Sequence, residues 1–203
     1  MLSSTLRQFS IKQRLIVLNI SALLGILVLF GITLSNTESN LYTLKKEENK
    51  HSVEVARTLV AHHYGLQQSG VLSEHEAQTA ALAALQNLRF DKTNYFWVND
   101  QTPTMIMHPI KPTLDGKNIA NVQDPNGKYL FKEMVDTVQS SGSGFVDYQW
   151  PKPNSEVPAD KISYVSGFSP WGWVIGSGMY LDDIEVFYNQ LIWQLVLVTF
   201  SLN

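Results

Sequence analysis

The chain has 203 residues and a formal net charge of -3, with 15 lysine and arginine residues against 18 aspartate and glutamate residues and no cysteine. A chain of this length accommodates one sizeable domain with its own hydrophobic core. The weak negative charge, without a basic stripe interleaved with aromatic residues, excludes nucleic acid as an expected partner. Without cysteine the chain can form neither disulfides nor thiolate metal sites, so its composition does not reveal the redox compartment.

The first predicted element is a transmembrane helix over residues 15–35. Between Leu15 and Leu34 the sequence carries no charged residue, and its only clearly polar members are Asn19, Ser21 and Thr33. About 20 residues at a rise of about 1.5 Å each cover the hydrocarbon thickness of about 30 Å, whereas the apolar region of a signal peptide has only about 7–15 residues. The alternative, a cleaved signal peptide, is disfavoured by this length and because no Ala-x-Ala site follows the apolar run.

The charges that flank this helix predict its orientation. Arg7, Lys12 and Arg14 precede the apolar stretch, and Glu38 is the first charged residue after it. Because positively charged flanks stay in the cytoplasm, we expect residues 1–14 to be cytoplasmic. The chain that follows the span is therefore predicted to lie on the outer side of the membrane.

The next segment predicts a helical hairpin. From Asn36 to about Gln68, mostly polar residues with leucine and valine at helical spacing indicate one long helix that continues out of the membrane. A break at Gln68-Ser69-Gly70 follows, and Ser73 stands three residues before Glu76, which is the pattern of a capping box. The second helix is expected to bury an apolar face made of Ala77, Ala81, Ala84, Leu85 and Leu88.

After Arg89 the sequence changes to short aromatic and branched runs that are typical of β-strands. A hairpin is predicted from residues 95–98 and 104–107, and a short helix over residues 129–139 follows a loop punctuated by proline and glycine. Turns in the remaining sequence are short enough for antiparallel order and join three strands, predicted over residues 145–150, 162–168 and 173–180. The predicted fold class is α+β, an antiparallel sheet of about five strands with the helical hairpin packed on it.

A second apolar run occupies residues 189–203. It is too short to cross the membrane, and we interpret it as the start of a second, truncated transmembrane helix. Tyr188 and Trp193 at its outer edge fit an interfacial aromatic belt. We therefore expect a cytoplasmic output region that is missing from this chain.

Catalytic and metal-binding patterns are scarce in this sequence. It contains no G-x-S-x-G, no phosphate-binding loop, no H-E-x-x-H and no dinucleotide glycine fingerprint. Its five histidines include no pair at i, i+4 spacing on one helix face, so no metal site, no cofactor and no enzyme activity are expected. Gly176-Ser177-Gly178 lies in a strand pattern, where glycines favour close packing against a helix over phosphate binding.

Three cationic residues stand where a pocket could form. His108 ends an apolar strand before Pro109, Arg89 precedes the first strand, and Lys161 opens another strand after a proline-rich turn. A carboxylate offers about four lone-pair sites and is bound best by charged donors, so the three cations are candidate anion ligands. Surface charge or structural ion pairing is the alternative for each of them. Aromatic residues of the strands are candidate walls that exclude water, namely Tyr95, Trp97, Tyr148, Trp150 and Tyr164.

Several motifs follow one another in an order that is more specific than any single motif. They are Tyr95-Phe96-Trp97-Val98-Asn99-Asp100, Met107-His108-Pro109, Leu114-Asp115-Gly116-Lys117, Asp124-Pro125-Asn126-Gly127-Lys128, Trp150-Pro151-Lys152-Pro153, Lys161-Ile162-Ser163-Tyr164-Val165 and the run from Phe168 to Gly178. Over residues 36–188 this series resembles a single Cache domain of the type found in bacterial methyl-accepting chemotaxis receptors. One departure is Ser177, where the family pattern leads us to expect threonine.

The resemblance implies a PAS-like antiparallel sheet with one ligand pocket, a long N-terminal helix, a homodimer, and a receptor of the inner membrane whose sensor domain is periplasmic. The ligands that it implies are small carboxylates such as acetate, propionate, pyruvate or lactate. We expect binding to favour one arrangement of the sheet and helices, which the flanking helices carry into the membrane. Carried over by position, the pocket comprises Arg89, Tyr95, Trp97, His108, Tyr148, Trp150 and Lys161, with Arg89, His108 and Lys161 facing the carboxylate.

Alternatives stay open at this point. A sensor histidine kinase or a diguanylate cyclase can use the same input domain, and amines or purines are other ligands of the same architecture. A membrane-anchored module that binds a periplasmic protein would need no small ligand. A tethered hydrolase would use His108 with Asp115 or Asp147, but the sequence offers no convincing set of nucleophile, base and orienting group.

Overall fold

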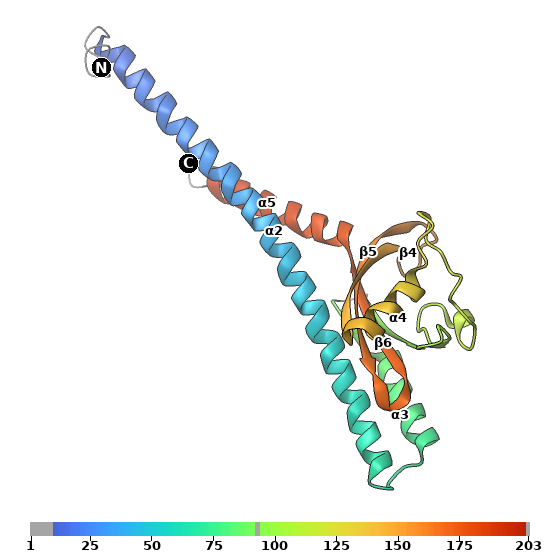
Figure 1. Cartoon of the computed structure of the whole chain (residues 1–203). Helices are drawn as coiled ribbons and strands as arrows, with labels where there is room; N and C mark the ends of the chain where they lie inside the picture. Colours follow the sequence, from blue (N-terminus) through green and yellow to red (C-terminus); the bar gives the residue numbers. More distant parts are fainter. Residues whose placement is uncertain (1–9, 92–93, 202–203) are drawn as a thin grey trace. The chain divides into compact units, whose positions relative to one another are not determined.

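The computed structural model describes residues 10–91 and 94–201 (Figure 1). The chain forms two compact units, Met1–Thr43 and Leu44–Asn203, and helix α2 (Ile11–Gln68) contributes to both. Arg7, one of the basic residues that predict the orientation of the first helix, lies outside the described residues.

The first unit contains the N-terminal part of α2. Its side chains from residue 15 to residue 32 are all exposed within the chain. The Ser21 and Thr33 hydroxyls donate to backbone carbonyls of the preceding turn, at 2.9 Å each, so both polar groups are satisfied by the helix itself. Exposed apolar side chains with internally bonded hydroxyls are what a lipid environment requires. Among the described residues, α2 is the one helix that is long and apolar enough to cross a membrane.

The predicted helical hairpin forms in the second unit. Its second helix buries Ala77, Ala81 and Leu85 as expected, whereas Leu88 is its C-cap and is exposed. Helix α3 (Glu74–Asn87) begins at a complete capping box, in which the Glu76 N–H donates to the Ser73 Oγ at 3.3 Å and the Ser73 N–H donates to the Glu76 Oε2 at 2.8 Å. These bonds satisfy backbone donors that the start of a helix leaves free. The apolar faces of the two helices meet in one buried cluster that includes Val53, Ala56, Val60, Ala81 and Leu85.

Six strands form one antiparallel sheet in the order β1-β2-β6-β5-β4, with β3 paired to β2. The last strand in the sequence, β6, therefore lies at the centre of the sheet. The predicted strands all form, and the two-residue β1 is added to them. The strands are β1 (Arg89–Phe90), β2 (Asn94–Asp100), β3 (Met105–Met107), β4 (Ser143–Pro151), β5 (Pro158–Phe168) and β6 (Trp173–Tyr180).

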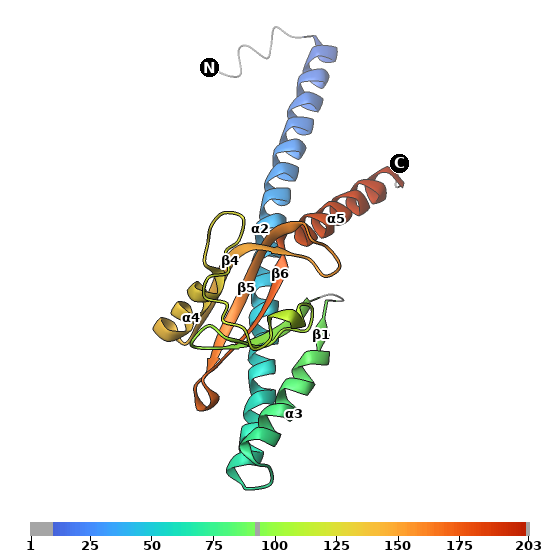
Figure 2. The same cartoon turned by 90° about the vertical axis from the view of Figure 1, so that its right-hand side faces the viewer.

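The sheet separates two hydrophobic clusters. Figures 1 and 2 show α2 on one side of the sheet and α4 (Leu130–Ser141) on the other. Because side chains alternate along a strand, β2 contributes Tyr95 and Trp97 to the cluster on the α4 side and Phe96 and Val98 to the cluster on the α2 side. Both faces are covered, which explains why β2 is a nearly continuous apolar run.

Helix α5 (Leu181–Ser201) follows β6 directly and includes most of the predicted second membrane segment. Asp182 and Asp183 lie in its first turn, where negatively charged side chains interact favourably with the helix dipole and stabilise the helix. Both carboxylates bind Lys152 of the loop between β4 and β5, at 2.8 and 2.7 Å. Short 3-10 turns, η2 (Pro112–Leu114) and η3 (Ser169–Trp171), complete the described elements.

Candidate ligand-binding site

Lys161 is a cation inside the domain, with only 2% of its surface exposed. In the strand registers it stands between Tyr148 of β4 and Tyr180 of β6, so the three side chains share one face of the sheet. Its Nζ donates to the Tyr95 hydroxyl at 3.1 Å and lies 4.4, 4.8 and 5.7 Å from the ring centroids of Tyr95, Tyr180 and Trp97. Within the described part of the chain it makes no ion pair. A buried ammonium held by rings and one hydroxyl has donor capacity left for an anion.

His108 is a neutral donor beside this cation. Its Nδ1 accepts the backbone N–H groups of Ile110 at 3.3 Å and Lys111 at 3.0 Å, so the ring proton is on Nε2. Burial and, to a smaller extent, the charge of Lys161 lower the pKa of His108 from 6.5 to about 3. The ring therefore stays uncharged at neutral pH, 5.1 Å from the ring of Tyr95, and offers one N–H.

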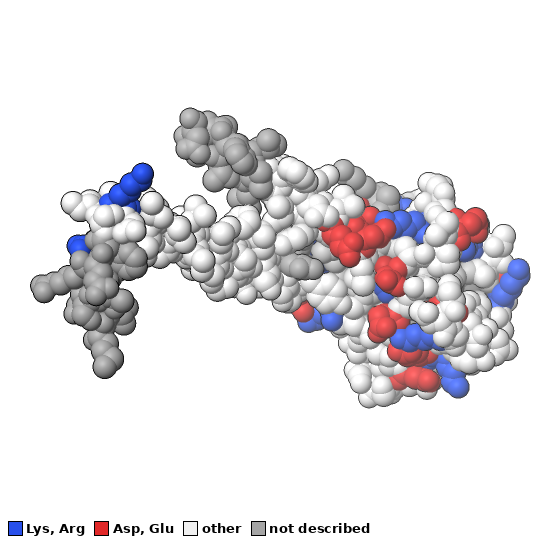
Figure 3. Space-filling view, turned by 90° about the horizontal axis from the view of Figure 1, so that it is seen from above, with Lys and Arg blue, Asp and Glu red and all other residues white. Residues whose placement is uncertain are grey.

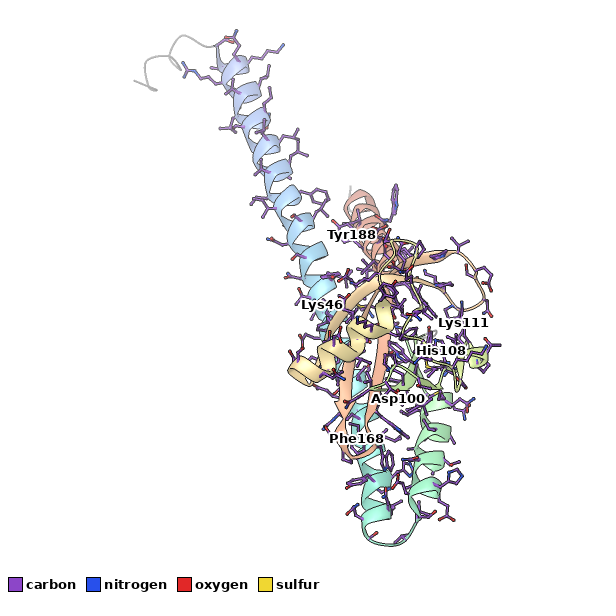
Figure 4. The ribbon with its side chains drawn as sticks, turned by 45° about the vertical axis from the view of Figure 1, so that its right-hand side comes forward. Lys46, Asp100, His108, Lys111, Phe168 and Tyr188 are labelled. Atoms are coloured by element: carbon purple, nitrogen blue, oxygen red, sulfur yellow. The ribbon has the colours of Figure 1, made fainter. Side chains whose placement is uncertain are left out.

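The loop after β3 fixes the position of His108. Pro109 ends the strand, and the His108 N–H donates to Asp115 Oδ1 at 2.8 Å, which ties the start of the loop to its first turn. Figure 4 shows His108 and Lys111 close together on this loop. The Lys111 ammonium lies 5.0 Å from the ring centroid of Trp150, at the edge of the cluster. Local backbone bonds, rather than strand pairing, thus orient the imidazole.

Aromatic side chains close the site on the α4 side. Tyr148 shares a hydrogen bond of 2.9 Å with the Ser163 Oγ, and Trp150 meets Phe131 of α4 edge to face at 5.8 Å. The Tyr180 hydroxyl donates to a backbone carbonyl of β4 at 2.8 Å. Burial raises the pKa of Tyr148 and of Tyr180 above the usual value, so both phenols stay protonated and neutral.

The predicted pocket residues, except Arg89, gather in this cluster. Arg89 is exposed, and its Nη1 donates to the backbone carbonyls of Gln86 at 2.8 Å and Leu88 at 2.7 Å. A basic side chain beside the end of α3 satisfies carbonyls that the helix leaves free, which explains its direction. Among the described residues, no contact joins the Arg89 guanidinium to Lys161 or to its neighbours.

Tyr164, which was predicted to be a wall of the pocket, lies on the opposite face of the sheet from Lys161. It packs with the α2-side cluster and donates from its hydroxyl to the Ser143 Oγ at 2.8 Å. Strand alternation places Lys161 and Ser163 on one face and Tyr164 on the other. The same alternation applied to β6 would have indicated Tyr180, which stands opposite Lys161 and was missed.

Two glycines of β6 make room for these side chains. A Cβ at Gly176 would collide with the Trp97 ring, and a Cβ at Gly178 would collide with the Ser163 Oγ and approach Lys161 Cε to 2.8 Å. The predicted close packing of these glycines is therefore confirmed, but they pack against side chains of neighbouring strands rather than against a helix.

Gly178→Ala is expected to lower the free energy of unfolding by about 1–3 kcal/mol, because overpacking forces the Ser163 and Lys161 side chains to move. Urea unfolding measures the change. Gly65→Ala is the matched control, since the space beside Gly65 on α2 is open. Alanine at this helix position should raise the free energy of unfolding by about 0.5–1 kcal/mol. A Gly178→Ala protein as stable as the parent would contradict the close packing at the site.

Neither carboxylate of the hydrolase alternative orients the imidazole of His108. Asp115 accepts the backbone N–H of His108 rather than a ring N–H, and Asp147 is exposed and paired with Lys128 at 3.4 Å. No group of three or more histidine, cysteine, aspartate or glutamate side chains that could hold a metal ion occurs within the described residues. Asp115 and Asp147 therefore supply no orienting contact to the His108 ring.

Figure 3 shows acidic and basic side chains interspersed on the face of the molecule that it presents. Among the described ion pairs, Lys45 binds Glu48 at 2.8 Å and Asp91 at 2.9 Å. Exposed pairs of this kind contribute little to stability. They do neutralise the lysines locally, in contrast to the buried Lys161.

Comparison with known proteins identifies this arrangement. Residues 41–194 match the family described as Single Cache domain 2. The chain belongs to this family. The PAS-like sheet and the long N-terminal helix are the Cache fold, and the site described above lies within the matched residues.

Two relatives of the chain are named for different kinds of signalling protein. The chain is 41% identical over 189 residues to the methyl-accepting chemotaxis protein McpP of Pseudomonas putida. The aligned region covers 93% of this chain and 35% of McpP. The chain is 37% identical over 113 residues to the sensor histidine kinase MctS of Rhizobium johnstonii. That aligned region covers 55% of this chain and 24% of MctS. The chain thus spans about a third or less of the length of these relatives.

Solved structures extend the similarity to the fold of the sensor part. A periplasmic sensor domain of a chemotaxis protein is 51% identical and superposes with a TM-score of 0.68, covering 69% of this chain and 97% of that domain. A Cache chemosensory domain described for its recognition of carboxylic acids is 43% identical, also with a TM-score of 0.68, covering 70% of this chain and 97% of that domain.

Proposed function

We propose that this Cache domain is the sensor of a transmembrane receptor and binds a small carboxylate at Lys161. The observation that carries the proposal is a buried lysine without an acidic partner in the described chain. A ligand carboxylate would supply the missing charge, while the Tyr95 hydroxyl and the His108 Nε2–H would supply neutral donors. Recognition of carboxylic acids by a related Cache domain supports the same ligand class.

The size of such a ligand is compatible with sensing. A carboxylate with about six heavy atoms, at a ceiling of about 1.5 kcal/mol per atom, gains at most roughly 9 kcal/mol on binding. This ceiling corresponds to a dissociation constant of about 0.3 μM. Complexes of micromolar or weaker affinity exchange quickly enough to follow a changing concentration. Acetate, propionate, pyruvate and lactate are the candidate ligands.

The proposed topology places residues 1–14 in the cytoplasm, residues 15–35 across the inner membrane, residues 36–188 in the periplasm and residues 189–203 at the start of a second span. The apolar part of α2 and the similarity to a periplasmic sensor domain support this arrangement. A homodimer, which the family resemblance implies, stays a prediction.

Chemotaxis is the proposed output, and a histidine kinase is the second candidate. The similarity to McpP extends over 93% of this chain, against 55% for MctS, which favours the chemoreceptor. In either case the output region would receive its input from the same site.

A thermal-shift comparison of propionate with propionamide tests the ligand class. The two molecules have the same shape, but only propionate carries a negative charge that Lys161 can neutralise. Residues 36–188 should melt at a higher temperature with millimolar propionate and at an unchanged temperature with propionamide, because a ligand that binds only the folded state stabilises it. Equal shifts would reject the charge-based site. A shift with amines or purines alone would keep the sensor and replace its ligand.

A further inference from the structure

One side chain of α2 enters the sheet. Asn49 is 1% exposed, and its Nδ2 donates to the backbone carbonyl of Ser177 on β6 at 3.1 Å. Its Oδ1 is buried and finds no hydrogen-bond partner among the described residues. The apolar neighbours that join α2 to the sheet pack without direction, whereas this amide fixes one relative position of helix and strand.

The Asn49 contact continues to the ligand site. The Ser177 Oγ, which is fully buried, donates to the backbone carbonyl of Tyr95 at 2.7 Å. The Tyr95 hydroxyl in turn accepts from Lys161 on the opposite face of the sheet. A series of hydrogen bonds and covalent links therefore crosses the sheet from Lys161, through Tyr95 and Ser177, to α2.

We propose that Asn49 is the positioning residue that couples the state of the Lys161 site to α2. The inference rests on the proposed sensor function. A carboxylate that accepts hydrogen bonds from both the Lys161 ammonium and the Tyr95 hydroxyl draws Tyr95 toward it, and the strand pair that holds the Ser177 carbonyl shifts with Tyr95. Asn49 transmits this shift to α2, because its bond to that carbonyl has a defined length and direction.

The described structure gives the Asn49 amide one hydrogen bond to the sheet, because its Oδ1 has no partner among the described residues. A single directed bond can be replaced by another when the helix and the strand shift. Asn49 and the apolar stretch that ends at Leu34 belong to the same helix, α2.

A double-mutant cycle on the full chain tests the coupling without any ligand. Lys161→Met removes the ammonium and its bond to Tyr95, and amide hydrogen exchange of α2 residues 44–52, followed by mass spectrometry, reports the response of the helix. We expect Lys161→Met to change exchange of this segment by at least about 5-fold when Asn49 is present. In the Asn49→Ala or Asn49→Leu background the same substitution should change it by less than about 2-fold.

Two further variants sharpen the cycle. Ser177→Ala removes the link between Asn49 and Tyr95 and should also suppress the response. Arg57→Ala is the matched control, because Arg57 likewise bonds from α2 to a backbone carbonyl, that of Gly167 at 3.0 Å, without contacting the series. In the Arg57→Ala background, Lys161→Met should change the amide exchange of residues 44–52 as much as it does in the parent.

An undiminished response in Asn49→Ala, Asn49→Leu and Ser177→Ala, or no response in the parent, would overturn the proposal. Calorimetric titration with propionate and acetate is run separately. Absence of binding would reject the ligand class of the site, while the cycle would still decide whether Asn49 couples the site to the helix.

Discussion

Replacing Lys161 with methionine is expected to weaken propionate binding at least about 30-fold. Methionine keeps the unbranched apolar stem of the side chain, one heavy atom shorter, and removes the positive charge. A charge pair desolvated at a binding site typically loses about 2–5 kcal/mol when one partner is truncated, which corresponds to factors of about 30 to several thousand. Isothermal titration of residues 36–188 measures the affinity. Lys111→Met is the control, since Lys111 lies at the edge of the cluster over Trp150 and should change affinity far less.

The same substitution is expected to stabilise the ligand-free domain. Lys161 is 2% exposed and unpaired within the described chain, and burying a charge without a counter-ion is costly. Lys161→Met should therefore raise the melting temperature of the free protein while it removes the upward shift caused by propionate. A variant that is destabilised and still binds propionate would show that Lys161 is a structural residue and would remove it from the site.

The stability of the domain is expected to fall steeply in acid because of His108. The folded protein takes up a proton on this ring near pH 3, and an unfolded histidine does so near pH 6.5. Between these values the unfolded chain binds more protons, so the free energy of unfolding decreases as the pH falls from 6.5 toward 3, by up to about 5 kcal/mol. Above pH 6.5 His108 contributes no pH dependence. Urea unfolding at pH 7, 5 and 4 measures the slope.

His108→Asn isolates this contribution from the titration of the carboxylates. The asparagine Oδ1 can accept the Ile110 and Lys111 N–H groups in place of Nδ1, while the titrating ring and its Nε2–H are lost. The variant should show a flatter dependence of stability on pH over the same window and weaker propionate binding at pH 7. Identical slopes for the variant and the parent would mean that the imidazole is not held neutral by its surroundings.

Much of the candidate site could be predicted because strand residues in a recurrent motif order have defined neighbours. Tyr95, Trp97, His108, Tyr148, Trp150 and Lys161 were selected from the chain and lie together in the structure. Arg89, which was selected for its charge and carried over by position with the others, makes no described contact with them. The direction of a long side chain at a helix end is decided by the nearest free carbonyls, here those of Gln86 and Leu88, which no sequence pattern reveals.

The sequence by itself determined the apolar stretch of α2, the capping box at Ser73, the strands and the family, because these depend on local periodicity, local hydrogen bonds and the order of motifs along the chain. Only the tertiary structure decided which strands pair, which face of the sheet meets α2 and which cation is buried. It pairs β2 with β6, and this long-range pairing brings Tyr95, Tyr180 and Lys161 together on one face and Asn49 to Ser177 on the other. Such contacts depend on register between segments distant in the chain, where a shift of one residue exchanges the two faces.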